Sequence, residues 1–343
     1  MDTSTLLPQH FAQLSLDSLR GVMSPPHRLS AQLIQQFNNN EENMQTLRLK
    51  PTPIALKPAH QETLIAAVDT STIKIGETST GPIIAVRGAN VWQQNRHYKY
   101  TRVGPFIFHV TEDNKNEVCN VLERAYFGLS HDANHQATPN LFQMPTRIAA
   151  LLEKWLQSTL SRTMNNGLLL FDGSLTAGTA DSPTQRMKEV LASARKRGNV
   201  VLAFSKMTSL RFNGYLITDF LPQTKPPYLL ETSGLHPRPP MVLLGDVYVA
   251  RLTKGNCAFR LDIDREILPE VRVEAVQKLL GNDVFQQSYP ETLRLAHILC
   301  TFTANEVLAM QHLVTRKYGL QIINRPDMHK LLFGHYGKGE NCS

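Results

Sequence analysis

Two short apolar runs, about a hundred residues apart, each end in an aspartate that precedes a turn. Leu64 to Val68 is followed by Asp69-Thr70-Ser71, and Leu168 to Phe171 is followed by Asp172-Gly173-Ser174. Runs of this length are typical of buried β-strands, and each would deliver its carboxylate to the edge of a sheet. Two such strands side by side would bring two carboxylates together, which is the donor chemistry of a divalent-metal site.

The order of the predicted elements is that of a mixed α/β fold. Strands are expected at residues 64–68, 83–87, 106–110, 168–171 and 200–204, and helices at residues 116–126, 147–161 and 183–197. The first three strands can form an antiparallel meander, and each of the later two follows a helix, as parallel strands do. We therefore predict a ribonuclease H-like core, a mixed sheet flanked by helices, with an N-terminal helical arm and C-terminal helices. Several enzyme classes use that core, so the fold alone does not set the chemistry.

Three segments are expected along the 343 residues. Residues 1–60 are polar with proline interruptions and form the N-terminal helical arm, residues 61–320 form the main domain, and residues 321–343 form a C-terminal tail. Within the main domain, residues 221–240 hold six prolines, which predicts a surface loop without regular structure that faces a substrate. A β-hairpin over residues 241–252 and 257–263, and helices starting at Glu270 and Pro290, complete the prediction.

Composition narrows the range of partners. No apolar stretch is long enough to span a bilayer and the first thirty residues lack a continuous apolar signal region, so a cytoplasmic protein without membrane contact is expected. The four cysteines are widely spaced, which indicates reduced thiols rather than disulfides or a zinc knuckle. A formal charge of +7 and a pI near 9.2 favour an anionic partner such as nucleic acid. Arg195-Lys196-Arg197 is either a phosphate-binding patch or, as we favour, the cationic end of a helix before Gly198.

The candidate metal ligands are acids beside apolar segments. Carboxylates that follow apolar runs are desolvated unless they are paired, which favours Asp69 and Asp172 as ligands, although either can also stabilise a turn. Glu153 lies at the border of the apolar stripe of its helix, where it points toward the core or is solvated. Together the three acids offer hard oxygen ligands for one or two Mg²⁺ or Mn²⁺ ions. Lys206 follows the last predicted strand of the core and either stabilises phosphate charge or is simply exposed.

Two further candidates lie near the C-terminal end. Pro290 suits the first position of a helix, which places Tyr289 at the mouth of that helix and His297 two turns deeper. Each residue has an ordinary structural alternative: a histidine among leucines is commonly a packed, hydrogen-bonded core residue, and a tyrosine before proline is commonly a surface anchor.

These residues, taken in order, resemble the NurA nuclease family. The resemblance runs from about Leu64 to Leu299, and it rests on Val68-Asp69-Thr70-Ser71, Glu153, Phe171-Asp172-Gly173-Ser174-Leu175, Ser205-Lys206 and Tyr289-Pro290 through His297. It implies a ribonuclease H-like core, a homodimer, and Mn²⁺-dependent 5′-to-3′ exonuclease and single-strand endonuclease action on DNA. It also implies work with a hexameric HerA-type translocase in processing DNA ends during double-strand break repair. By the same resemblance, Asp69, Glu153 and Asp172 bind metal while Tyr289 and His297 complete the active site, with Lys206 as a further catalytic candidate.

The chain departs from the family pattern in places, and other functions stay open. Thr70 stands where the family commonly has glycine, Glu117 and Glu123 compete with Glu153, and residues 221–240 have no clear counterpart. An actin-like or sugar-kinase-type ATP-binding phosphotransferase is one alternative, because such proteins share the core and use Asp-Gly-Ser phosphate turns like the one at Asp172. No adenosine-binding glycine motif follows late in the chain. A non-catalytic DNA-binding scaffold of the same fold is the other alternative.

Overall fold

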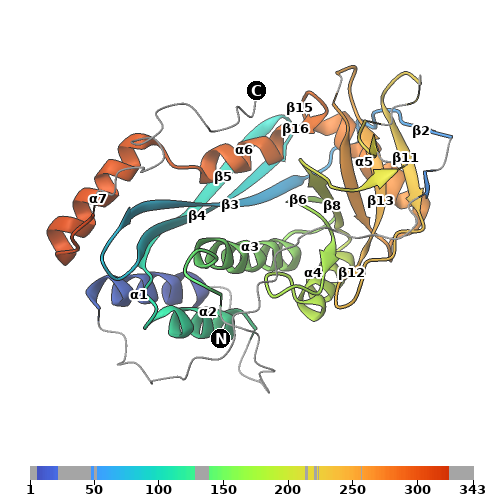
Figure 1. Cartoon of the computed structure of the whole chain (residues 1–343). Helices are drawn as coiled ribbons and strands as arrows, with labels where there is room; N and C mark the ends of the chain where they lie inside the picture. The colour runs from blue at the N-terminus through green and yellow to red at the C-terminus, as the bar shows by residue number, and fades with distance from the viewer. Residues whose placement is uncertain are drawn as a thin grey trace, which may run out of the picture.

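A ten-stranded mixed sheet runs through the protein (Figure 1). The computed structural model describes residues 6–21, 48–49, 52–127, 139–212, 215–219, 222, 224–255 and 257–323. The strand order is β1-β11-β13-β14-β8-β6-β3-β4-β5, with β2 beside β11. The strands are β1 (Arg48–Leu49), β2 (Ile54–Ala55), β3 (Ile65–Glu77), β4 (Pro82–Gln94), β5 (His97–His109), β6 (Leu168–Asp172), β8 (Val200–Ser205), β11 (Tyr228–Ser233), β13 (Gly245–Arg251) and β14 (Phe259–Asp264).

The centre of the sheet confirms the predicted ribonuclease H-like core. Strands β3, β4 and β5 form antiparallel pairs, whereas β6 is parallel to β3 and β8 is parallel to β6. Helix α3 (Met144–Thr163) lies in the crossover before β6, and α4 (Thr184–Lys196) lies in the crossover before β8. The antiparallel meander and the two later strands that each follow a helix are the elements that the sequence predicts, and the structure arranges them in the sheet order β5-β4-β3-β6-β8.

Helices cover both faces of the sheet (Figure 1). On one face, α3 and α4 pack with α1 (Leu6–Arg20) and α2 (Lys115–Phe127) against inward side chains such as Val68 and Phe171. On the other face, α5 (Pro269–Asn282) and α6 (Glu291–Cys300) pack against the alternate residues of the same strands, among them Ala67 and Leu170. Because side chains alternate along a strand, every central strand is buried on both faces, which explains its continuous apolar run.

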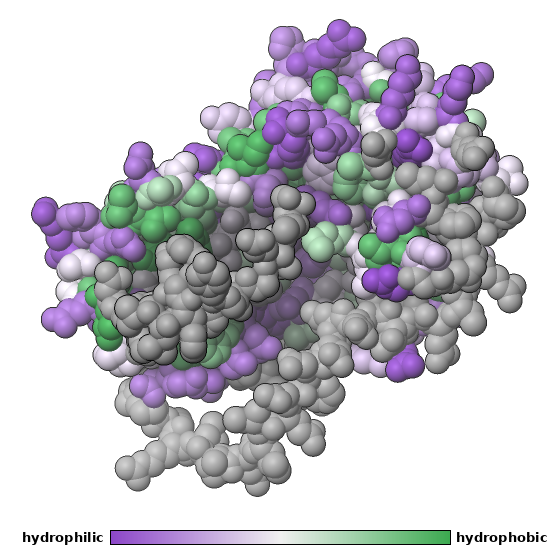
Figure 2. Space-filling view, turned by 45° about the horizontal axis from the view of Figure 1, so that its top comes forward, coloured by the Kyte–Doolittle hydropathy of each residue, from purple (hydrophilic) through white to green (hydrophobic). Residues whose placement is uncertain are grey.

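Helix α7 (Ala304–Tyr318) continues the chain beyond α6 and was not predicted from the sequence. Its ends have clear local causes: Thr303 and Glu306 form a capping box at the start, and Gly319 adopts a left-handed conformation with φ of 67° at the end. Met310 and Val314 fasten the helix to the far ends of β3 and β4. Figure 2 shows hydrophobic residues among hydrophilic ones toward the end of the molecule that carries α7.

Three short ribbons and one hairpin complete the architecture. The predicted late hairpin is present as the antiparallel pair β13 and β14. The ribbons pair β7 (Thr176–Ala177) with β12 (Val242–Leu243), β9 (Arg211–Phe212) with β10 (Tyr215–Leu216), and β15 (Phe285–Gln286) with β16 (Tyr289–Pro290). The ribbon of β7 and β12 thus ties the chain that follows Asp172 to the start of the hairpin.

Two predictions of local structure were wrong. Strands β3, β4 and β5 are each 13 residues long, so the apolar runs mark only part of each strand, and Asp69 lies inside β3 rather than at its end. The proline-rich segment does contain a regular element, β11, which pairs with β13 and β2. Its prolines stand before residue 228 and after residue 236, which leaves a proline-free stretch long enough for a strand.

The expected N-terminal arm and C-terminal tail are described only in part. Helix α1 lies in the arm, while residues 22–47, the polar stretch at 128–138 and residues 324–343 lie outside the described residues. The domain limits at residues 60 and 320 stay predictions. None of the helices that the structure describes is both long enough and apolar enough to cross a lipid bilayer.

Candidate active site

Three neighbouring strands carry rows of apolar side chains on the face that α5 and α6 cover, and each row leads to a charged residue. The rows are Ile65-Ala67-Asp69 on β3, Leu168-Leu170-Asp172 on β6, and Leu202-Phe204-Lys206 at the end of β8. Strands β3 and β6 are in parallel register up to the pair Val68 and Phe171, so Asp69 and Asp172 are the next residues along. The sheet therefore sets the two carboxylates side by side on one face.

Lys206 reaches both carboxylates. Its Nζ lies 2.7 Å from Oδ2 of Asp172 and 4.0 Å from Oδ2 of Asp69. Asp69 is only 6% exposed, and burial raises the pKa of its carboxyl, with the charge of Asp172 acting in the same direction. The lysine ammonium therefore supplies positive charge where two acids would otherwise repel each other.

His297 and Tyr289 complete the group from the C-terminal part of the chain. Nδ1 of His297 lies 2.8 Å from Oδ2 of Asp69, and half of the imidazole side chain is exposed. The ring of Tyr289 packs against Phe204 and lies 5.7 Å from Nζ of Lys206. The buried hydroxyl of Tyr289 has no hydrogen-bond partner among the described residues, and burial together with the two aspartates raises its pKa. Residues from β3, β6, β8, β16 and α6 thus meet at one place.

Glu153 approaches the same place from α3, on the opposite face of the sheet. It lines one pocket with Asp69 and Asp172, and Nε2 of Gln157 donates to its Oε1 at 2.7 Å. Burial raises the pKa of Glu153 to about 7, and the charges of both aspartates act in the same direction. The competing acids lie elsewhere: Glu123 forms an ion pair with Arg147, and neither it nor Glu117 lines the pocket.

The pocket has a volume of about 700 Å³ and is rich in hydroxyl groups. Besides the three acids and Lys206, it is lined by Gly173, Ser174, Thr176, Thr179, Ser205, Met207, Thr208, Ser209, Met241 and Arg260. Hydroxyls and cations beside carboxylates can bind an anionic, sugar-bearing substrate together with a cation. Met207 follows Lys206 at the rim and is 92% exposed.

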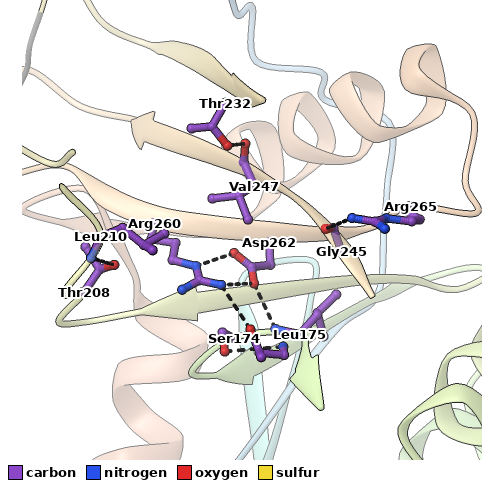
Figure 3. A network of polar contacts seen from close by, with 11 residues as sticks. Ser174, Leu175, Thr208, Leu210, Thr232, Gly245, Val247, Arg260, Asp262 and Arg265 are labelled. Atoms are coloured by element: carbon purple, nitrogen blue, oxygen red, sulfur yellow. Dashed lines mark hydrogen bonds and ion pairs between the residues drawn. The ribbon is translucent and has the colours of Figure 1, made fainter. Parts of the chain in front are cut away.

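A buried ion pair supports the wall of this pocket (Figure 3). Nε and Nη2 of Arg260 donate to the two oxygens of Asp262 at 2.8 and 2.9 Å. Oδ2 of Asp262 also accepts from the backbone N–H of Leu175 at 2.9 Å, and Nη2 of Arg260 donates to Thr176 Oγ1 at 3.3 Å. The pair therefore fixes the turn that follows Asp172, and sequence reasoning did not single out either member.

The acids, histidine and cysteine at this place can bind a divalent cation, although the three ligand atoms that lie nearest one another are not those of the three acids predicted from the sequence. Among the described residues, one set has all its ligand atoms within 4.8 Å of one another, namely Asp69, His297 and Cys300. Asp69, Glu153 and Asp172 face a common pocket without meeting that limit. Burial and the charge of neighbouring aspartates raise the pKa of both Asp69 and Glu153, and this is the electrostatic setting that a bound cation relieves.

No protein-family model and no curated protein matches the chain. Among solved structures, it is similar to the crystal structure of the NurA nuclease from Sulfolobus solfataricus, at 16% identity and a TM-score of 0.48, over 80% of this chain and 90% of that one. It is also similar to endonuclease V from Bacillus subtilis, at 12% identity and a TM-score of 0.34, over 77% and 88% of the two chains. A third is Ciona intestinalis endonuclease V in complex with DNA containing an inosine, at 10% identity and a TM-score of 0.34, over 75% and 92%.

The structure links five of the six residues selected from the sequence through a chain of neighbours that runs by way of Asp69 and Lys206. They are Asp69, Asp172, Lys206, Tyr289 and His297, and Glu153 joins them across the pocket. Cys300 was missed, although its spacing of three residues after His297 on a helix was visible in the sequence. Arg195 of the basic run is held by Asp264 and Glu266, and Nη1 of Arg197 donates to Asn165 Oδ1.

Proposed function

We propose that this protein is a metal-dependent deoxyribonuclease that hydrolyses phosphodiester bonds. The observation that carries the proposal is the adjacent placement of Asp69 and Asp172 by parallel strands, with the Lys206 ammonium between them and a polar pocket in front. A carboxylate pair at one edge of a mixed sheet is suited to hold a cation against a phosphate group. The net positive charge of the chain supports an anionic polymer as the substrate.

The acids are the expected cation ligands. Asp69, Glu153 and Asp172 would hold one or two Mn²⁺ or Mg²⁺ ions through carboxylate oxygens, the donor type that both ions prefer. A bound ion of this kind supplies an activated water and stabilises charge on the leaving oxygen.

The remaining side chains have roles that follow from their positions. Lys206 lies at the pocket and carries the charge needed to bind a phosphate oxygen once a cation has replaced it beside the aspartates. His297 points Nδ1 at Asp69, so its other ring nitrogen is suited to accept or donate a proton. Tyr289, with a buried and unpartnered hydroxyl, would position water or DNA.

Finer properties belong to the same proposal and are supported by the motif resemblance in the sequence. They comprise a preference for Mn²⁺, 5′-to-3′ exonuclease and single-strand endonuclease action, and a homodimeric state. They also comprise cooperation with a hexameric HerA-type helicase or translocase in processing DNA ends for double-strand break repair.

The decisive experiment is cleavage of end-labelled single- and double-stranded DNA with Mn²⁺, Mg²⁺ or EDTA. Native protein, Asp172→Asn and the matched surface control Asp113→Asn would be purified identically, and circular dichroism would confirm folding. We expect cation-dependent cleavage that falls at least about a hundredfold in Asp172→Asn, as removal of groups that stabilise transition-state charge does, and that is unchanged in Asp113→Asn.

Equal cleavage by native protein and Asp172→Asn would contradict the site. Two other results would favour the other functions. ATP binding without DNA cleavage, even when the translocase is present, would indicate the phosphotransferase. Its phosphate-binding turn would be the one at Gly173, where φ is 97° and no atom beyond the adjacent residues lies within 4 Å of the position that a Cβ would take. DNA binding without cleavage, again with the translocase present, would indicate the scaffold.

A further inference from the structure

Cys300 lies against the candidate active site but has no role in the proposed hydrolysis. It is the last residue of α6, and its side chain is fully buried. Its Sγ, a ring nitrogen of His297 and a carboxylate oxygen of Asp69 all lie within 4.8 Å of one another. The thiol donates to the backbone carbonyl of His297 at 3.1 Å, so it is held at this place by its own helix.

The spacing explains why the two helical residues face the same point. Residues three apart on a helix are neighbours on its surface, so His297 and Cys300 both point from α6 toward β3. Asp69 meets them from the sheet, because it continues the row of β3 that packs under α6. In a tetrahedral site with a Zn–S bond of about 2.3 Å and a Zn–N bond of about 2.1 Å, the two ligand atoms lie about 3.6 Å apart. The three ligand atoms lie within 4.8 Å of one another, so side-chain shifts of about 1 Å would bring them to bonding distance of one common ion.

The ligand types favour a different ion from the one that hydrolysis uses. A thiolate and an imidazole select Zn²⁺ and similar ions, whereas Mn²⁺ and Mg²⁺ prefer oxygen ligands. One carboxylate and one thiolate also cancel the charge of a divalent ion, which suits a site in which two of three ligands are buried. We propose that Asp69, His297 and Cys300 form a binding site for a thiophilic divalent cation such as Zn²⁺.

Binding at this site exchanges protons in a defined way. The Cys300 thiol releases its proton to solvent as the sulfur–metal bond forms. The proton in the hydrogen bond between Nδ1 of His297 and Asp69 is also released, and the imidazole binds the ion through Nδ1 as the neutral tautomer that carries its proton on Nε2. The exposed half of His297 provides the route by which the ion enters. A water molecule completes the fourth position of the tetrahedron, as at other zinc sites with three protein ligands.

The two sites share Asp69, so they cannot be filled independently. A thiophilic ion held by His297 and Cys300 draws the Asp69 carboxylate away from the cation that Asp172 and Glu153 help to hold. Zn²⁺ therefore acts as an inhibitor that competes with Mn²⁺. This inhibitory role rests on the proposed nuclease function, whereas the binding site itself does not.

Cobalt spectroscopy tests the binding site without reference to catalysis. Full-length protein, treated with EDTA and then freed of it, would be titrated with Co²⁺, which replaces Zn²⁺ and gives a near-ultraviolet charge-transfer band when it is bound by a thiolate. Native protein would be compared with Cys300→Ser, and with Cys257→Ser as a control at a cysteine outside this group. We expect the band in native protein and in Cys257→Ser, its loss in Cys300→Ser, and a Zn²⁺ affinity at least about tenfold weaker in that variant, since changes of outer-shell partners alone cost 10–100-fold.

A full band in Cys300→Ser, or no band in native protein, would overturn the proposal. Because Cys300 is buried, circular dichroism would check folding, and Cys300→Ala and His297→Gln provide two further variants that must also lose the band or weaken the ion's affinity. The second arm measures inhibition of Mn²⁺-supported DNA cleavage by Zn²⁺, relative to the uninhibited rate of each protein. We expect Cys300→Ser to need at least about ten times more Zn²⁺ than native protein, and equal sensitivity would refute the inhibitory role while leaving the cobalt result to decide the site.

Discussion

Nζ of Lys206 lies 2.7 Å from Oδ2 of Asp172, in an ion pair between the ends of two parallel strands. The same ammonium is 4.0 Å from Asp69, so a single lysine offsets part of the negative charge of the two acids that we propose as cation ligands. A divalent ion and this lysine therefore compete for the same carboxylates.

Replacing Lys206 with methionine should separate cation binding from catalysis. The variant removes the competing ammonium, so we expect Mn²⁺ to bind several-fold more tightly, in line with about 1 kcal/mol for a partly exposed ion pair. Cleavage should nevertheless slow, because the phosphate loses its cationic partner. Isothermal titration calorimetry measures the Mn²⁺ affinity, and a DNA cleavage assay measures the rate. Lys188→Met on the surface of α4 is the control. Weaker Mn²⁺ binding in Lys206→Met would show that the lysine helps the ion rather than competing with it.

Removing one member of the buried Arg260–Asp262 ion pair should destabilise the protein more than replacing both members. Arg260 is 2% exposed and Asp262 is fully buried. Arg260→Met leaves a buried carboxylate uncompensated, which costs about 3–5 kcal/mol of unfolding free energy, whereas a double replacement by apolar residues should cost less. Urea unfolding measures both, and Lys278→Met, at a surface pair with Glu274, should cost less than about 1 kcal/mol. A small loss in Arg260→Met would mean that water reaches Asp262.

The core strands were predictable because burial on both faces leaves a local signature. Residues 168–171 and 200–204 are continuously apolar, and runs of four or five residues between turn residues are too short for a typical helix. The outer halves of β3, β4 and β5 carry no continuous apolar run. In β4, the polar residues Asn90 and Gln93 are buried through tertiary contacts that a local pattern does not encode, and the first half of β5 is mostly exposed. Strand β11 was hidden by its flanking prolines.

The sequence indicated which residues belong to the site but not the distances between them. Asp69 and Asp172 stood out because each follows an apolar run, and the resemblance gave more weight to the candidates Tyr289 and His297. Their distances depend on the register of β3 against β6 and on the packing of α6, which are set by contacts more than a hundred residues apart in the sequence. Cys300 escaped notice because a cysteine at the end of an apolar helix is most simply a core residue.

Stability should fall as the pH rises from about 4 to 6 because of Asp283. Its carboxylate accepts from Tyr98 Oη at 3.0 Å and from the N–H of Thr292 at 3.1 Å at the start of α6, and burial raises its pKa to about 6. In the unfolded state the pKa of an aspartate is about 3.9. Because the folded-state pKa of Asp283 is higher, this group stabilises the folded protein fully below about pH 4, and that contribution is lost as the pH rises through about 6. The loss is about 2–3 kcal/mol at 1.36 kcal/mol per unit.

Asp283→Asn provides the comparison for this effect. The amide does not titrate, so the difference between native and variant unfolding free energies should change across this window and be constant above it. Urea unfolding at several pH values measures it. If the unfolding free energies of the two proteins changed in parallel with pH, the pKa of Asp283 in the folded protein would lie in the ordinary range for an aspartate.

Gly88 should be required for the close approach of α3 to the sheet. A Cβ at this position of β4 would lie 2.5 Å from Cδ1 of Leu156 and 3.5 Å from Cδ2 of Leu152, two residues that flank Glu153 on the helix. Gly88→Ala should therefore cost about 1–3 kcal/mol of unfolding free energy and weaken Mn²⁺ binding by displacing Glu153. Gly255→Ala, where the nearest atoms are at 3.5 Å, is the control. Unchanged stability and ion affinity in Gly88→Ala would mean that α3 repacks freely.

The in-register pairing of β3 and β6 limits where insertions and deletions can be tolerated in this chain. The segment between the two strands, which includes β4, β5, α2 and α3, pairs with the other edge of β3 and packs on the sheet without interrupting the pairing of β3 with β6. Loops in that interval can lengthen or shorten without moving either carboxylate. Deleting one residue inside residues 65–68 or 168–171 would instead turn the following aspartate to the opposite face of the sheet. Insertions and deletions in related genes should therefore be frequent in the intervening loops and absent from those two short segments.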